Sequence, residues 1–433
     1  MKVITLIFFL LSCSSITFDG SSHRPKNNYK FSVLQGTTDE TSTVIRLVYP
    51  NFLSPTYEVL DSKGKKIKIH KIADFEKKAF EFRVTHIFLE NLSPESTYAL
   101  NIRTKFKHWK DSRTFRTLNS KGDKLKILVA SCMSDSYNDV GNIIWPQALG
   151  HNPDVMFLTG DNLYADVYSG VYIGNKIPTS PEHLWRRHID HAMKMHVYRA
   201  QKLTPTFTTW DDHDYGVNDG DKSYKYKKQS KKIFQTFFPI KENNFVKLGH
   251  GVGNSFNFKG HNFLFLDGRS FRDSAEDKKG YQLGKQQRAW VSKTASSTND
   301  LNWLIMGDQF FGAYHPFESF EGRHPVQFKS FLNELKMTDK KYVFLSGDRH
   351  LVEVMKIDAK EFGKQSYEYT VSGMHTKMYA GSLSQSENSR RVGGFDTDPN
   401  YAIFELDKKE GKNTVRFKAY TIDEIVIDRS DTI

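Results

Sequence analysis

Seven short apolar runs after residue 123 have the length and composition of buried β-strands. They are Lys124–Ala130, Val155–Leu158, Pro205–Thr209, Phe263–Leu266, Trp303–Met306, Tyr342–Leu345 and Tyr369–Val371. Such runs are typical of strands that are covered on both faces. Helical patterns alternate with them, at Val140–Leu149, His183–Leu203, Ser223–Phe238, Gly284–Ala295 and Gln327–Lys336. The alternation predicts an α/β domain over residues 121–433.

Each of these runs is followed by polar residues that carry chemistry. In chain order they include Cys132, Asp161, Tyr164, Asp212, His213, Arg269, Asp308, Asp348, His350 and His375. Ligand sites in open α/β sheets lie at the carboxyl ends of the strands. We therefore expect these side chains to meet at one edge of a sheet and to form one site.

Residues 30–120 have a different pattern, with short β-rich runs separated by turn signals. The runs are Thr43–Tyr49, Thr56–Leu60, Lys66–Ile72 and Ala79–Ile87. The segment Leu92–Ile102 resembles the corner-and-strand signature of fibronectin type III sandwiches, with Tyr98 as the corner tyrosine. We predict a small all-β fibronectin/Ig-like domain over residues 30–120, joined to the α/β domain through Asn119–Asp123.

The first twelve residues predict an export signal. Lys2 gives a basic start, and Val3–Leu11 is an apolar core that is too short to span a bilayer. Leu10-Leu11-Ser12-Cys13 resembles the lipobox of bacterial lipoproteins, which implies cleavage before Cys13 and lipid attachment at its thiol. An ordinary secretory signal that contains a cysteine is the alternative. On the lipoprotein interpretation residues 13–29 are a tether, and the protein is exported and anchored through lipid in the bacterial cell envelope, at the periplasm, the outer membrane or the cell surface.

The net charge bears on the kind of binding partner, and the cysteine content bears on the role of Cys132. The net charge of +12 over 433 residues is compatible with nucleic acid, acidic lipid or a small anionic substrate in a basic cleft. The chain has 2 cysteines, so lipid on Cys13 would leave Cys132 without a disulfide partner. A buried Cys132 that acts as a small hydrophobe is one explanation. Its place at a strand end favours the other, a metal-bound thiolate.

One predicted helix carries several histidines without a metal motif. They are His183, His188, His191 and His196, and their spacing lacks the His-Glu-x-x-His arrangement. We expect a solvated helix face there.

Five motifs, in this order and spacing, resemble those of the PhoD-like alkaline phosphatases and phosphodiesterases, within the calcineurin-like metallophosphatase superfamily. They are Ser131-Cys132, Gly160–Asp166, Trp210–Asp214, Leu266–Arg269 and Ser346–His350. The resemblance covers about residues 30–405. It implies a layered α/β metallophosphatase β-sandwich with helices outside, preceded by the small β-sandwich. It also implies hydrolysis of phosphate monoesters or diesters by a dinuclear metal centre that activates a water molecule.

Two metal ions about 3.5–4 Å apart would supply the charge neutralisation and the aligned water that a phosphate ester needs. Asp161 is the natural bridging carboxylate between them. The thiolate of Cys132 and the phenolate of Tyr164 are strongly donating anions, which suit a trivalent or borderline-soft metal. With His350 they are expected to bind iron, as Fe³⁺.

The second ion is expected to be divalent and bound by hard oxygens. Asp212 and Asp348 offer such oxygens, and Asn218 is a weaker candidate. Calcium is the leading choice, with magnesium, manganese or zinc as alternatives. Relatives usually have a histidine ligand in the block where this chain has Asp308-Gln309. Asp308 and His375 also follow predicted strands at the proposed site, and they are further candidates for metal or substrate binding.

Two residues are candidates for direct roles on the substrate. His213 directly follows a predicted ligand, and in the family the matching histidine assists departure of the leaving group as a general acid. The guanidinium of Arg269 suits a phosphate oxygen, whereas the alternative is a structural ion pair with Asp267 or Asp273.

Two other functions remain open at this stage. A nuclease or lipid phosphodiesterase on the same metal core would use the positive charge. A non-enzymatic surface lipoprotein would use its β-sandwich for adhesion. We expect a phosphate-ester substrate, a membrane contact through Cys13, no dedicated nucleic-acid partner and a monomer.

Overall fold

The computed structural model describes residues 31–77, 80–104, 109–166, 178–247, 251–298, 300–409 and 412–433. The predicted signal over residues 1–12, Cys13 and the tether over residues 13–29 lie outside the described residues. Within the described ranges, no helix is long and apolar enough to cross a membrane. The fold is mixed α/β and dominated by sheets, as predicted.

Residues 32–116 form two four-stranded antiparallel sheets. In sheet order the first contains β1 (Ser32–Thr38), β2 (Thr43–Pro50), β6 (Phe82–Leu89) and β5 (Lys71–Glu76). The second contains β4 (Lys66–Ile67), β3 (Pro55–Asp61), β7 (Thr97–Thr104) and β8 (Lys110–Arg116). The run Lys66–Ile72, predicted as one strand, is thus split between two sheets.

Apolar side chains of both sheets share one core. Ile45 and Ile87 come from the first sheet, and Leu100 and Ile102 from the second. Tyr98 is buried, and its hydroxyl accepts a hydrogen bond from the backbone N–H of Ser93 at 2.8 Å, the contact across the corner that a corner tyrosine makes. The fibronectin type III assignment itself stays a prediction.

The rest of the chain forms two larger sheets, of six and seven strands. The order of the first is β11 (Thr206–Thr209), β10 (Val155–Thr159), β9 (Lys124–Ala130), β19 (Tyr401–Lys409), β20 (Lys412–Tyr420) and β21 (Ile425–Thr432). The order of the second is β12 (Asn254–Phe258), β13 (His261–Phe265), β14 (Leu301–Ile305), β15 (Tyr342–Ser346), β17 (Ser366–Val371), β16 (Val352–Ile357) and β18 (Arg391–Phe395). Each predicted strand overlaps one of these, and β9, β10 and β11 run parallel, as do β13, β14, β15 and β17.

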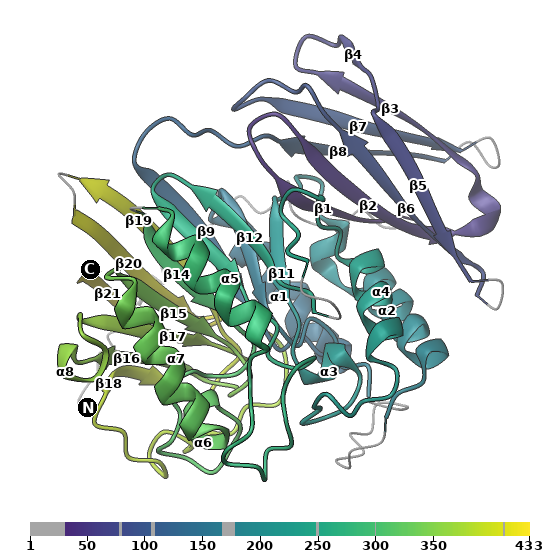
Figure 1. Ribbon diagram of the computed structural model, residues 1–433. Coiled ribbons are helices and arrows are strands. Elements are labelled where there is room, and N and C mark those ends of the chain that lie inside the picture. The colour runs from purple at the N-terminus through teal and green to yellow at the C-terminus, as the bar shows by residue number, and fades with distance from the viewer. Residues whose placement is uncertain are drawn as a thin grey trace, which may run out of the picture.

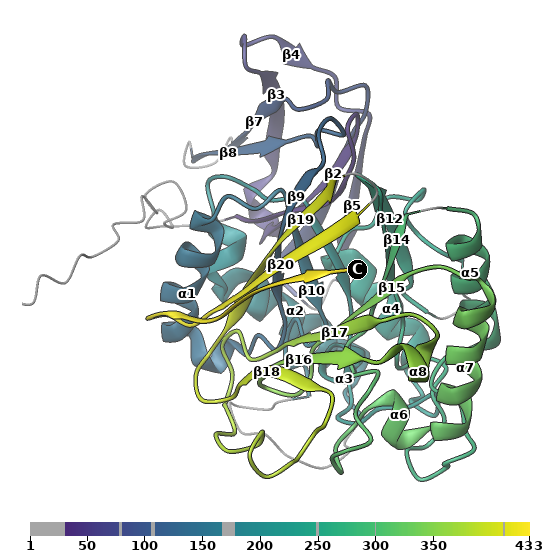
Figure 2. The same cartoon turned by 90° about the vertical axis from the view of Figure 1, so that its left-hand side faces the viewer.

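Helices cover the outer faces of the two large sheets, as Figures 1 and 2 show. The helices α1 (Asn138–Gly150), α2 (Pro181–Lys194) and α4 (Lys227–Phe237) pack on the six-stranded sheet. The helices α5 (Lys285–Ser296), α7 (Pro325–Met337) and α8 (Ala359–Phe362) pack on the seven-stranded sheet. Between the sheets, aromatic side chains such as Phe157, Phe263 and Trp303 form a third core. Strands covered on both faces explain why the sequence shows continuous apolar runs.

The two N-terminal sheets are joined to the rest by polar and apolar contacts. The ring of His86 hydrogen-bonds the carbonyl of Thr236 at 2.8 Å, and Arg113 donates to the carbonyl of Ala200 at 2.7 Å. Leu34 and Val48 belong to the same core as helices α1 and α2. The N-terminal sheets thus share a core with α2, the histidine-bearing helix.

The prediction of a solvated histidine face on that helix was therefore wrong. His188 and His191 on α2, and His196 in the short 3-10 helix His196–Arg199 that follows, are all at most 4% exposed. His188 stacks on Phe237 with ring centroids 4.7 Å apart, and His191 hydrogen-bonds the carbonyl of Met133 at 3.2 Å. The neighbouring elements that cover this helix leave no signal in its own sequence.

Candidate functional site

A cleft of about 720 Å³ lies where the parallel strands of the two large sheets end. Seven of the predicted site residues line it, namely Asp161, Tyr164, Asp212, His213, Asn218, Asp348 and His350. Cys132 lies below the surface of the cleft, in contact with Tyr164. Arg269, Asp308 and His375 are not among the lining residues.

The backbone at this strand edge is bent into conformations that ordinary residues rarely adopt. Cys132, Asp161, Asp348 and His350 have positive φ angles of 56°, 48°, 65° and 50°. Residues held there store of order 1–3 kcal/mol each and cluster at functional sites. At Gly160, with φ of 94°, an added Cβ would lie 2.7 Å from the Cβ of Asp211. The turn after β10 therefore requires glycine in order to present Asp161 to the cleft.

Carboxylates crowd the floor of the cleft, where Asp161, Asp212 and Asp348 line it, and Asp211 lies buried beside them. Asp161, Asp211, Asp212 and Asp348 each offer an oxygen, and these oxygens all lie within 4.8 Å of one another. Burial, together with the charge of Asp212, raises the pKa of Asp348 to about 8. Burial also raises the pKa of Asp161 well above its ordinary value. Buried like charges at this spacing are costly without a cation, so the donor set fits divalent metal binding.

A thiol, a phenol and an imidazole adjoin Asp161. The sulfur of Cys132 is 3.5 Å from Oδ2 of Asp161 and accepts a hydrogen bond from the hydroxyl of Ser372 at 3.1 Å. The hydroxyl of Tyr164 lies 2.9 Å from Nε2 of His350. Burial raises the pKa of Cys132 to about 12, and that of Tyr164 well above its usual range. These soft and anionic donors fit a strongly charged metal ion, which would hold both groups deprotonated.

The tautomer of His350 suits a ligand. Its Nδ1 lies 2.7 Å from the carbonyl of Lys377, which can only accept a hydrogen bond, so Nδ1 carries the proton. The lone pair of Nε2 then faces the hydroxyl of Tyr164. A backbone carbonyl behind a histidine is a common way to orient a metal ligand.

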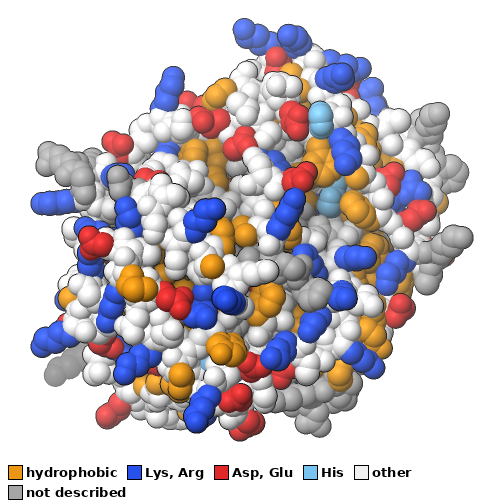
Figure 3. Space-filling model, in the orientation of Figure 1, with side chains coloured by type: hydrophobic (Ala, Val, Ile, Leu, Met, Phe, Trp, Pro, Cys, Tyr) orange, Lys and Arg blue, Asp and Glu red, His pale blue; other side chains and the backbone are white. Residues whose placement is uncertain are grey.

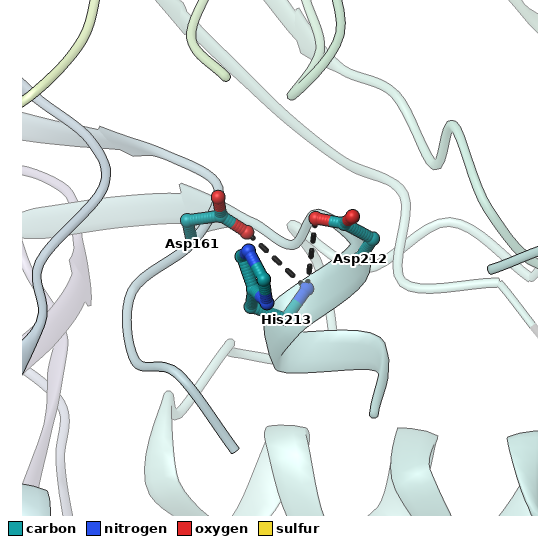
Figure 4. Close-up of side chains that lie close together, drawn as sticks. All are labelled: Asp161, Asp212 and His213. Carbon is teal, nitrogen blue, oxygen red and sulfur yellow. Dashed lines mark hydrogen bonds between the residues drawn. The ribbon is translucent and has the colours of Figure 1, made fainter. Parts of the chain in front are cut away.

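His213 stands at the start of the short helix α3 (Asp212–Tyr215), between Asp161 and Asp212 (Figure 4). Its backbone N–H donates to Asp161 at 3.3 Å and to Asp212 at 2.9 Å. Its ring Nδ1 lies 2.7 Å from the carboxylate of Asp166, and its ring packs on Tyr164 with centroids 4.1 Å apart. Burial alone would lower the pKa of His213, but the carboxylates of Asp166, Asp212 and Asp161 raise it well above its usual value.

Arg269 does not reach the cleft. Its side chain is fully buried and pairs with Asp211, with Glu318 and, at 2.9 Å, with Asp308. The prediction that it holds a phosphate oxygen was therefore wrong, and the structural alternative holds. The partners differ from those expected, because Asp267 instead accepts hydrogen bonds from Trp210 and from nearby backbone N–H groups.

Asp308 and His375 also have structural partners. Asp308 accepts a hydrogen bond from Gln282 at 2.6 Å in addition to its ion pair with Arg269. Nε2 of His375 accepts from the indole N–H of Trp145 at 3.1 Å, and its Nδ1 lies 3.0 Å from the carbonyl of Ser134. Since both ring nitrogens of His375 are engaged, its assignment as a ligand or substrate residue was wrong.

The structure adds residues that the sequence reasoning missed. Asp166 supports His213, and Asp219 and Glu318 each place an oxygen within 4.8 Å of Asp212 and of each other. Asp166 lies in the same motif as Asp161, so the sequence already indicated that its side chain is close to the site. Glu318 follows no predicted strand, and only the three-dimensional fold brings it to the cleft.

Comparisons with known proteins place these features in a family context. The family model for PhoD-like phosphatases matches residues 127–422. No curated protein gives a significant match. Among solved structures, the sensor domain of the anti-sigma factor RsgI4 from Pseudobacteroides cellulosolvens is similar at 17% identity, over 21% of this chain and 90% of that one. Its TM-score of 0.16 is too low to say anything of fold or function.

Proposed function

Because the chain belongs to the PhoD-like phosphatase family, whose model matches residues 127–422, we propose that it hydrolyses phosphate esters at the cleft described above. The observation that carries the proposal is the convergence of Asp161, Asp212, His213 and Asp348 on one cavity from the ends of three strands, β10, β11 and β15. Monoesters and diesters are both within the proposal.

Two sets of residues would hold metal ions. Cys132, Tyr164 and His350 suit iron, and Asp161 would bridge to a second, divalent ion, calcium in the first instance. Asp212 and Asp348 would complete the second set, with Asn218 and the newly found Asp219 beside them. When bound, the ions would neutralise the phosphoryl oxygens and activate the attacking water.

His213 would protonate the leaving oxygen. Because Nδ1 is engaged with Asp166, Nε2 is the nitrogen that could deliver a proton to a substrate. The Asp166 carboxylate stabilises the protonated ring and fixes its orientation. A proton-donating histidine that is oriented by a buried carboxylate is a common arrangement in active sites.

The cellular setting is part of the same proposal. Export, lipid attachment at Cys13 and a location in the bacterial cell envelope rest on the signal and lipobox patterns of residues 1–13. We propose a monomer without a dedicated nucleic-acid partner. On the face seen in Figure 3, Lys and Arg side chains are scattered among acidic and apolar ones, whereas nucleic-acid binding favours a continuous basic stripe.

Turnover of two esters by the purified, metal-loaded protein tests the function. We expect phosphate release from 4-nitrophenyl phosphate, nitrophenol release from bis(4-nitrophenyl) phosphate, or both. Asp161→Asn should lower kcat at least about hundredfold, because metal catalysis supplies several kcal/mol. Asp428→Asn, an exposed carboxylate paired with Arg416, is the matched control and should have no effect. A protein that turns over neither ester with any of iron, calcium, magnesium, manganese or zinc would refute the proposal.

A further inference from the structure

Three cations on the wall of the cleft have no carboxylate partner among the described residues. They are Arg323, Arg349 and Lys377, and we call them the cationic wall. Three other arginines of the same domain, Arg272, Arg390 and Arg391, are ion-paired. The contrast is informative because an unpaired guanidinium in a concave site attracts an anion from solution.

The carboxylates near the cationic wall form ion pairs with other side chains. Glu318 lines the same cleft, but its oxygens are engaged by Arg269 and Arg272. Asp166 is paired with His213. The remaining acidic groups of the floor are the proposed metal ligands. The cationic wall therefore has no internal anion to neutralise it.

Arg349 is the cation of the wall with the most side-chain contacts given by the structure. It is 7% exposed, and its Nη1 donates to Oε1 of Gln309 at 3.2 Å. Its guanidinium lies 4.7 Å from the ring centroid of Phe317. Gln309 is in turn held by His315, at 2.8 Å, and by Thr370, at 2.8 Å. A guanidinium fixed on a ring face and by an amide needs little ordering when it binds a ligand.

The other two cations flank the same opening. Nε of Arg323 is buried without a hydrogen-bond partner. The ammonium of Lys377 lies 5.2 Å from the ring centroid of Tyr379. The backbone carbonyl of Lys377 is the group that orients His350. Phe317 and Tyr379 are 54% and 51% exposed, so both present apolar surface beside the cations. The wall thus combines positive charge with surface that suits an organic group.

We propose that the cationic wall is a second anion subsite, and that preferred substrates are phosphate esters whose leaving alcohol carries another anionic group, a phosphate or a carboxylate. The inference rests on the proposed phosphate-ester hydrolysis. The metal ions would neutralise the negative charge of the reacting phosphoryl group. The positive charge of the cationic wall is therefore in excess of what one phosphate requires, and it could pair with a second anionic group. Each charge-assisted hydrogen bond to the second anion favours binding by about ten- to a hundredfold.

Fructose 1,6-bisphosphate and fructose 6-phosphate are matched probes, and phosphate release measures kcat/KM for each. We expect the wild type to prefer the bisphosphate at least about tenfold, mainly through KM, beyond the factor of about two that a second hydrolysable phosphate gives. Arg349→Gln should remove that preference, with a loss on the bisphosphate about tenfold larger than on the monophosphate. Arg416→Gln, an exposed arginine outside the cleft, is the control and should preserve the preference.

Two results would overturn the subsite. One is a wild type without preference, and the other is an equal loss on both sugars in Arg349→Gln, which would assign Arg349 to the reacting phosphate. If neither sugar is hydrolysed, calorimetry of the same two sugars on the metal-loaded protein decides. Tighter binding of the bisphosphate that is lost in Arg349→Gln supports the subsite, and equal dissociation constants refute it. Failure of the proposed function is separate, since it is the absence of turnover of any phosphate ester.

Discussion

Removing the carboxylate behind His213 should move the pH dependence of hydrolysis in a calculable direction. The perturbation is Asp166→Asn, which keeps the shape but loses the charge that lies 2.7 Å from Nδ1 of His213. The carboxylate raises the pKa of His213, so the proton-donating form persists to higher pH in the wild type. Activity that needs this form falls as pH rises through that pKa. In Asp166→Asn the fall should begin at lower pH.

The size of the shift follows from the hydrogen bond. A buried, charge-assisted bond contributes about 1.5–3 kcal/mol. One pKa unit corresponds to about 1.4 kcal/mol, so the alkaline limb of kcat should move down by about one to two pH units. His213→Gln, which removes the acid itself, should lower kcat about 10²–10⁴-fold.

Two leaving groups separate this role from metal binding. An alkyl ester such as glycerol 3-phosphate needs a proton on its departing oxygen, whereas 4-nitrophenolate leaves without one. The loss in His213→Gln should therefore be large for glycerol 3-phosphate and small for 4-nitrophenyl phosphate, with metal content unchanged. Equal losses on both esters together with loss of metal would show that His213 is a ligand and that the reasoning is wrong.

Three further predictions concern the frame of the site, its stability and its anchorage. Gly160→Ala should destabilise the fold by roughly 1–3 kcal/mol in urea titration, because an added Cβ meets Asp211 and φ is positive; unchanged stability would mean that the turn can relax. Burial lowers the pKa of both His86 and His261 to about 4, so the unfolded chain binds more protons than the folded one between about pH 6.5 and 4. The free energy of unfolding should therefore fall with decreasing pH by about 1.4 kcal/mol per unit for each histidine, and a flat profile over this window would contradict their burial as neutral rings. Cys13→Ser should abolish lipid labelling and release the protein from membranes, and continued membrane retention would point to another anchor.

The sequence predicted the strands of the site well because they are covered on both faces. Runs such as Val155–Leu158 must then be apolar throughout, which makes both their length and their polar ends visible. The order of the motifs also identified Asp161, Tyr164 and His350 as neighbours, and the structure brings them together at one cleft.

The sequence did not reveal which hydrogen-bond or ion-pair partners the residues at the strand ends have. Arg269 and Asp308 each follow a strand just as Asp161 does, yet they pair with one another beneath the cleft. His375 likewise follows a strand, but both of its ring nitrogens are hydrogen-bonded, one to Trp145 and the other to Ser134. Strand position fixes which edge a residue occupies, whereas competition among buried polar groups decides whether it faces the cavity. That competition depends on residues such as Glu318 that lie far away in sequence.

Metal analysis combined with visible absorption of the purified protein tests the central claim most directly. We expect iron together with a second divalent ion, and a visible band, because phenolate and thiolate ligands of Fe³⁺ allow electrons to be excited into the metal. Tyr164→Phe should shift or bleach the band, since the ring remains while the donor oxygen is lost. Cys132→Ser should weaken iron retention, since a neutral hydroxyl replaces a thiolate. Activity should fall with iron content in both variants. A colourless, iron-free and fully active protein, with both variants behaving like the wild type, would contradict the assignment of this metal centre.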